Sequence, residues 1–173
     1  MIKGINLAER EKSIKYIETF KKPNNSIRDV KISNSHIANL NHMIGRKIFK
    51  KNSLYISSAT IHDLLQPLGG KNQHNYHALT PADIFMALLS IKDPKYVFVA
   101  NTERYAFISV ETISVGHPLM IIVETGASLL RNLNAKINKI VTIYPKSDVD
   151  KYIEKLEDGL LIYEKGAVKK PKR

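Results

Sequence analysis

The stretch YVFVANTERYAFISVETISVGHPLMIIVE, residues 96–124, decides the fold of this chain. It contains three segments rich in Val, Ile, Phe and Tyr, and residues 137–144 (INKIVTIY) add a fourth. Segments of this composition, bounded by Asn, Gly, Pro and Asp, are typical of β-strands. Because residues 101–103 and 114–117 are short enough for hairpin connections, we predict an antiparallel meander, with a last edge strand over residues 160–163.

The residues before this stretch follow mostly helical spacing. The run TPAD at 80–83 is typical of a helix start, with a threonine cap, a proline at the first position and an acid at the third. Helices followed by a sheet indicate an α+β fold. The other patterns predict helices over 8–21, 34–49 and 145–156, a helix capped by Ser57 or Ser58, and a brief strand over 29–33.

Charge is spread unevenly along the 173 residues, which carry a formal net charge of +11. Residues 1–50 hold 11 basic and 4 acidic side chains, and the chain ends in the acid-free run VKKPKR (168–173). A positive field at both ends attracts a polyanion without dictating its sequence. The pattern favours contact with nucleic acid, although a solvated surface and a frayed tail would give the same counts.

Composition and missing motifs exclude several classes of protein. The absence of cysteine excludes disulfide scaffolds, thiolate zinc sites, iron–sulfur clusters and a cysteine nucleophile. No phosphate-binding or dinucleotide-binding glycine loop and no His-Glu-x-x-His motif is present, so we expect no cofactor and no metal. Apolar runs such as Leu119–Val123 are far shorter than the roughly 20 residues of a membrane helix. We therefore expect a soluble, cytoplasmic protein without a membrane partner.

A few residues have the chemistry of a metal-free nuclease. His77 lies in the polar loop 71–77, and imidazole serves as acid or base near neutral pH. Strand alternation places Thr142 and Tyr144 on one face, with Lys146 just beyond the strand end. Arg104 at the start of another strand is a second candidate cation for a phosphate. Equally, His77 could only close the start of the next helix, and Tyr144 could only pack against a neighbour.

Further basic side chains are candidates for binding nucleic acid rather than for chemistry. His74 shares the polar loop of His77, and a metal pair formed by these two histidines is less favoured than a metal-free role. The remaining candidates are Arg131 in the expected loop 127–135, Lys139 on the fourth strand segment, and Lys169 and Lys170 in the tail.

An ordered set of segments between about residues 55 and 167 resembles the phage-associated branch of the barnase–EndoU–colicin–RelE-like (BECR) nucleases. The matching pieces are the helix near residues 57–65, HALTPADI (77–84), Asp93-Pro94, INKIVTIYPK (137–146) and GLLIYEK (159–165). The resemblance implies N-terminal helices packed on a four-stranded antiparallel β-sheet. It also implies that His77 and the Thr-x-Tyr-x-Lys strand end form the site, with threonine at 142 where serine is more usual.

The resemblance divides the chain into a basic helical segment (1–50), a BECR-like nuclease domain (51–168) and a basic tail (169–173). It implies a toxin-like, metal-independent endoribonuclease that cleaves RNA through the ribose 2′-hydroxyl. The expected partners are RNA and an acidic immunity or antitoxin protein, with delivery into a target cell as one route of action.

Two alternatives remain open at the level of sequence. A non-catalytic RNA- or DNA-binding module would use the basic ends together with the sheet aromatics Tyr96, Phe98, Tyr105 and Phe107 for stacking. A nucleotide-modifying transferase is less favoured, because the chain lacks a convincing Glu-x-Glu signature.

Overall fold

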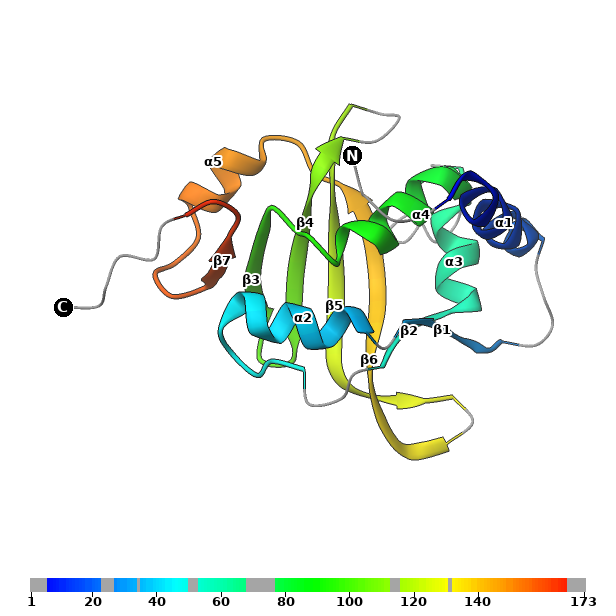
Figure 1. Cartoon of the computed structure of the whole chain (residues 1–173), viewed down its shortest axis with the longest axis horizontal. Coiled ribbons are helices and arrows are strands. Elements are labelled where there is room, and N and C mark those ends of the chain that lie inside the picture. The colour runs from blue at the N-terminus through cyan, green and yellow to red at the C-terminus, as the bar shows by residue number, and fades with distance from the viewer. Residues whose placement is uncertain are drawn as a thin grey trace.

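The computed structural model describes residues 6–22, 27–33, 35–49, 53–67, 77–112, 116–130 and 132–167. Within these ranges seven strands form one sheet in the order β1-β2-β6-β5-β4-β3-β7 (Figure 1). The strands are β1 (Asp29–Ser33), β2 (Leu54–Ser57), β3 (Tyr96–Asn101), β4 (Arg104–Thr112), β5 (Pro118–Leu129), β6 (Asn132–Pro145) and β7 (Leu161–Glu164).

The sheet is mixed, because β2 runs parallel to β6 while the other neighbouring strands are antiparallel. The α+β class predicted from the sequence is confirmed, but the four-stranded antiparallel sheet is wrong. The four predicted segments form the centre of the sheet, and β1, β2 and β7 extend it on both sides. The sequence analysis did not recognise β2, since its four residues LYIS run directly into the helix that Ser57 caps.

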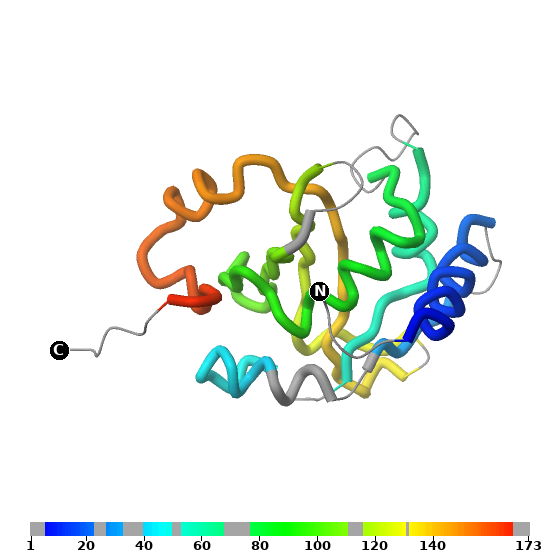
Figure 2. Tube along the Cα trace, turned by 45° about the horizontal axis from the view of Figure 1, so that its top comes forward, coloured from blue at the N-terminus to red at the C-terminus, as the bar shows by residue number. Residues whose placement is uncertain are grey.

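The helices are α1 (Leu7–Glu18), continued by the 3₁₀ turn η1 (Thr19–Lys21), α2 (Ser35–Ile44), α3 (Ser58–Leu64), α4 (Pro81–Ser90) and α5 (Val149–Glu154). The first helices share one buried cluster with one face of the sheet, whereas α5 packs on the other face. Alternation along β3 makes this division clear: Val97 belongs to the larger cluster, and Tyr96 and Phe98 belong to the smaller one. Figure 2 shows α1, α3 and α4 gathered on one side of the strands.

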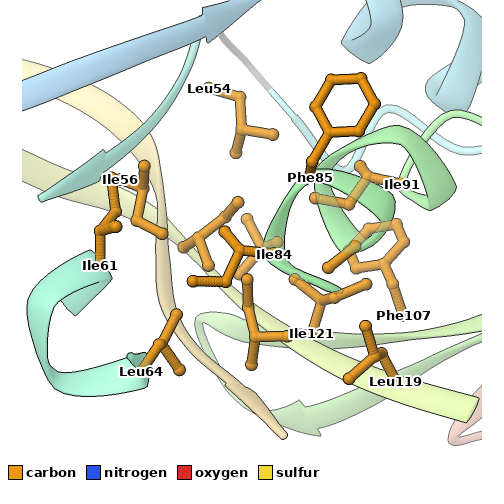
Figure 3. Close-up of a cluster of buried hydrophobic side chains, with 14 of the residues drawn as sticks. Leu54, Ile56, Ile61, Leu64, Ile84, Phe85, Ile91, Phe107, Leu119 and Ile121 are labelled. Carbon is orange, nitrogen blue, oxygen red and sulfur yellow. The ribbon is translucent and has the colours of Figure 1, made fainter. Parts of the chain in front are cut away.

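The larger cluster is a well-packed core of aliphatic and aromatic side chains (Figure 3). Ile84 of α4 lies beside Ile121 of β5, Ile61 of α3 lies beside Ile56 of β2, and all four are 2% exposed or less. Burial of such side chains contributes about 1.5–3 kcal/mol each to the free energy of folding. This packing fixes α3 and α4 against the sheet, and so positions His77 and the residues that lead from it into α4.

Residues before position 50 take part in this same core. Ile17, Phe20, Leu40 and Phe49 are each 5% exposed or less and belong to the larger cluster. β1 also pairs with β2 in the common sheet. The boundary expected at residue 50 therefore does not coincide with a break in the packing.

β5 and β6 continue beyond the sheet as a long hairpin arm, visible at the bottom of Figure 1. The loop expected over residues 127–135 is therefore wrong at most of its positions. Ala127 pairs with Ile137, and Ser128 pairs with Lys136. The Leu130 amide at the tip donates a hydrogen bond of 2.7 Å to Asp29 Oδ2 in β1, which ties the arm to the sheet edge.

The start of α4 is stabilised by the capping box that the TPAD run predicts. Thr80 Oγ1 accepts a hydrogen bond of 3.1 Å from the Asp83 amide, and Asp83 Oδ2 accepts one of 2.9 Å from the Thr80 amide. We expect Thr80→Ala to lower the free energy of unfolding by about 1 kcal/mol, since it leaves an amide at the helix start without its partner. Urea unfolding measures this, with Thr80→Ser as the control that retains the hydroxyl. Equal stability of the Ala variant and the wild type would contradict the expectation.

No helix among the described residues is long and apolar enough to cross a membrane.

Candidate functional site

His77 from the helical half of the chain meets Thr142 and Tyr144 of β6. The distance between His77 Nε2 and Thr142 Oγ1 is 3.4 Å. The rings of His77 and Tyr144 lie with their centroids 5.7 Å apart and their planes tilted by 36°. An imidazole, an aliphatic hydroxyl and a phenol are thus gathered around one point at the end of β6. All three residues are candidate catalytic residues from the sequence.

The backbone that follows His77 is held in place. The Ala78 amide donates to the Gln66 carbonyl (3.0 Å), and the Leu79 amide donates to the Leu64 carbonyl (2.9 Å), so this segment is tied to the end of α3. Ala78 has φ of 50°, in the left-handed region that a non-glycine residue rarely adopts. The bonds to α3 and the capping box of α4 together hold this conformation, and they direct the His77 ring toward β6.

Thr142 and Tyr144 lie on the face of the sheet that carries the smaller cluster. In the β5–β6 register, Thr142 pairs with Ile122 and Tyr144 pairs with Met120. The Tyr144 hydroxyl donates a hydrogen bond of 2.8 Å to Met120 Sδ. A thioether is a weak acceptor, so a phosphate oxygen would displace it readily. Burial, and secondly the neighbouring Tyr152, raise the pKa of Tyr144, which keeps the phenol protonated and able to donate at neutral pH.

Lys146 follows β6 directly, and its side chain turns toward α5. Its Nζ lies 4.2 Å from the centroid of the Tyr152 ring, a cation–π contact. The Lys146 amide donates to the Pro118 carbonyl (2.9 Å), which fixes the backbone at this point. Tyr152 also raises the pKa of Tyr144, so Lys146 and Tyr144 share Tyr152 as a neighbour.

Tyr152 belongs to this group although no sequence motif indicates it. The sequence does place a tyrosine in the helix that follows the Thr-x-Tyr-x-Lys strand end. Its contact with Lys146, however, depends on the turn between β6 and α5, which reverses the chain. Asp148 in that turn has φ of 49°, and it brings α5 back over the end of the strand.

Arg104 does not join the site. It pairs with Glu124 across β4 and β5, four positions from Met120, the partner of Tyr144, which places it toward the other end of the strands. Its Nη2 lies 2.8 Å from Glu124 Oε2, so the side chain already has an anionic partner. The expectation that Arg104 supplies a second phosphate cation beside Lys146 is therefore not met by this geometry.

Lys139 is also not a free cation. Its Nζ lies 3.0 Å from Asp29 Oδ1, and the two side chains are only 17% and 6% exposed. The Glu124 and Lys139 backbones face each other in the register, far from the end of β6 where Tyr144 lies. Lys139 therefore stabilises the junction of β1 and β6 rather than presenting a charge for nucleic acid. The other candidate nucleic-acid-binding residues lie outside the described residues: His74, Arg131, Lys169 and Lys170.

The sheet aromatics do not form a stacking surface. Tyr96, Phe98 and Phe107 are 7%, 1% and 0% exposed, and Tyr105 packs partly buried against the larger cluster. Stacking of bases needs accessible ring faces. This part of the nucleic-acid-binding alternative is therefore wrong, because the segments that carry these rings are buried on both faces.

The His77 imidazole sits half-buried, and this burial lowers its pKa below the ordinary value of 6.5. It is thus mostly neutral at neutral pH and able to accept a proton. Among the described residues, no group of three His, Asp or Glu side chains is placed to hold a metal ion. The arrangement offers a proton acceptor, two hydroxyl donors and one ammonium.

The lowered pKa of His77 has a consequence for stability. The folded state binds this proton less readily than the unfolded chain does. The contribution of neutral His77 to the free energy of unfolding is therefore complete above about pH 6.5, and it is lost as the pH falls through the lower folded-state pKa. We expect the free energy of unfolding to decrease over that acidic range, and to decrease less steeply in His77→Gln. Urea unfolding of both proteins at a series of pH values measures this, and parallel curves would contradict it.

A family model for the phage MuF C-terminal domain matches residues 69–168 of the chain. The matched range contains His77, Thr142, Tyr144, Lys146 and Tyr152, whereas α1, β1, α2, β2 and α3 precede it. The match confirms the phage association that the resemblance implied. No curated protein and no solved structure matches the chain.

Proposed function

The chain belongs to the phage MuF C-terminal domain family, and on this premise we propose that it is a metal-independent endoribonuclease that acts at the His77 site. The observation that carries the proposal is the approach of the His77 ring to Thr142 and Tyr144, at 3.4 Å from the hydroxyl and 5.7 Å between ring centroids. Residues separated by more than 60 positions in sequence supply complementary groups to one point.

The proposed reaction is transesterification of the RNA backbone. His77 accepts the proton of the ribose 2′-hydroxyl, the 2′-oxygen forms a bond to phosphorus, and the bond from phosphorus to the 5′-oxygen breaks. The products are a 2′,3′-cyclic phosphate and a 5′-hydroxyl, and the departing oxygen takes a proton from a donor in the site or from water. His77 can accept its proton because burial lowers its pKa.

The remaining groups are assigned to the phosphate. The hydroxyls of Thr142 and Tyr144 donate to phosphate oxygens, and Lys146 compensates the charge that develops on them. Tyr144 is suited to this because its raised pKa keeps the donor proton in place. Tyr152 holds the Lys146 ammonium over its ring, so the cation stays near the strand end.

The test is incubation of the purified protein with single-stranded RNA in the presence of EDTA. We expect cleavage, with products that end in a 2′,3′-cyclic phosphate, and no cleavage of the same sequence carrying 2′-O-methyl groups. The control is DNA of the same sequence, which lacks the 2′-hydroxyl. RNA that stays intact while the protein remains folded and monodisperse would contradict the proposal. Binding of RNA without cleavage would favour the nucleic-acid-binding alternative.

A further inference from the structure

A cavity of about 460 Å³ lies between α1, β1 and α4, away from the residues of the proposed ribonuclease site. Its apolar lining includes Val30 and Ile32 of β1 and Leu88 and Leu89 of α4, which are partly exposed and lie over the buried side chain of Ile56 of β2. Figures 1 and 2 both show α1 beside α4 on the side of the molecule that carries β1. The cavity therefore has an apolar floor with a helix on either side. We call it the α1–α4 groove.

Three lysines from three different elements line the same groove: Lys12 of α1, Lys31 of β1, and Lys92 just after α4. None of them forms an ion pair with any residue that the structure describes. Lys95 and Lys165, in contrast, each form an ion pair with an aspartate. Burial lowers the pKa of Lys92, as expected for an ammonium that is partly withdrawn from water without a compensating anion.

The apolar floor and the lysines of the α1–α4 groove together indicate which kind of molecule could bind there. An apolar floor between two helices fits the non-polar face of a third helix. Three lysines among the residues that line this floor give it a positive charge, which fits carboxylates that flank apolar anchors. A fatty acid would place its single carboxylate at one lysine and leave two unpaired, and RNA would gain nothing from the apolar floor. We propose that the α1–α4 groove docks an acidic amphipathic helix of a partner protein.

The residues that line the groove come from both sides of the start of the range that the family model matches. Lys12 and Lys31 precede the range that the family model matches, whereas Phe85 and Lys92 lie within it. The groove thus joins the family domain to the segment in front of it, and a partner seated there recognises this chain rather than the domain alone. The inference does not depend on the ribonuclease proposal, because no lining residue belongs to the His77 site.

The test measures binding of labelled peptides to the full chain by fluorescence anisotropy. The probe is a peptide of roughly 18 residues, long enough to form a helix, with Leu along one face and Glu on the flanks. One control peptide replaces every Glu by Lys, and a second replaces every Leu by Ser. We expect only the Glu–Leu peptide to bind, with both controls at least about tenfold weaker.

Variants of the protein locate the binding site. We expect Lys31→Glu and Lys92→Glu each to weaken binding of the Glu–Leu peptide about tenfold, because each reverses a charge in the lining of the groove. The matched control is Lys155→Glu, an equal change of charge at an exposed position after α5. Amide chemical shifts of the unmodified protein give a second measurement that needs no variant, and we expect the peptide to perturb α1, β1 and α4.

Several outcomes would overturn the proposal. They are failure of the Glu–Leu peptide to bind, equal binding of the Lys control peptide, equal effects of Lys155→Glu and the groove variants, and shifts confined to other elements. Dodecanoate that binds one-to-one and displaces the peptide would assign the groove to a small amphiphile instead. RNA that competes for the same three lysines would assign it to nucleic acid.

Discussion

His77→Ala is expected to reduce RNA cleavage by about 10²–10⁴-fold, the range typical for loss of a group that transfers a proton in the transition state. The imidazole is the one group in the cluster whose lowered pKa leaves it neutral and basic at neutral pH. Measurement of initial rates in EDTA, at saturating and at limiting RNA, gives the result. The loss should appear mainly in kcat, because the alanine variant retains Lys146 and the hydroxyls that bind phosphate.

The pH dependence of the wild-type enzyme provides an internal check. Because His77 must be neutral to accept a proton, activity should rise with pH through its folded-state pKa, below 6.5, and then level off. An activity that falls as pH rises through this range would instead make the protonated imidazole the active form. A His77→Ala variant that is folded and cleaves at the wild-type rate would remove His77 from the chemistry.

Two cations give a matched comparison within the same experiment. Lys146→Ala should lower cleavage strongly, since its ammonium lies over the Tyr152 ring just beyond the end of β6. Arg104→Ala removes an equal charge but should change cleavage little, because Arg104 is paired with Glu124 toward the other end of the strands. The reverse result would restore the assignment that the sequence suggested for Arg104 and exclude the one that geometry favours.

The strand-end cluster could be anticipated because its signals are local. Alternation along β6 puts Thr142 and Tyr144 on one face of the sheet, independently of how the other strands pair. The capping box fixes the start of α4, shortly after His77. The contact between His77 and Thr142 needed only that His77, shortly before the cap of α4, lie beside the end of β6. The structure shows that it does, with bonds from Ala78 and Leu79 to the end of α3.

The predictions that the structure contradicts concern residues whose surroundings depend on pairing between distant segments of the chain. Arg104 and Lys139 carry cationic groups that could bind phosphate. Only the pairing of the strands shows that each already has an anionic partner, Glu124 and Asp29 respectively. β2 is too short for a pattern, and it becomes a strand because β1 and β6 offer edges on both sides. The sequence alone suggests that Tyr96 and Phe98 are available for stacking, but the smaller cluster, which includes Val149 and Tyr152 of α5, buries them.

Breaking the Asp29–Lys139 pair is expected to cost about 3–5 kcal/mol of the free energy of unfolding, the range for an ion pair that loses one partner in a buried setting. The carboxylate of Asp29 is 6% exposed and the ammonium of Lys139 is 17% exposed, so Asp29→Asn leaves a charge with little access to water. Asp29 Oδ1 accepts no hydrogen bond from the described residues, so its contact with Lys139 is electrostatic. Oδ2, in contrast, accepts from the Leu130 amide, which Asn can retain. Urea unfolding measures the loss.

The double variant decides whether Lys139 acts in structure or in binding. Asp29→Asn combined with Lys139→Met removes both charges, and we expect it to recover much of the stability that either single change loses, because paired neutral groups avoid the desolvation cost. RNA affinity, measured at a temperature where all variants are folded, should be the same for Lys139→Met and the wild type. Lys136→Met on the exposed arm is the control for simple loss of a surface charge. Additive losses of stability, together with weaker RNA binding by Lys139→Met alone, would show that the lysine contacts nucleic acid and that its approach to Asp29 is incidental.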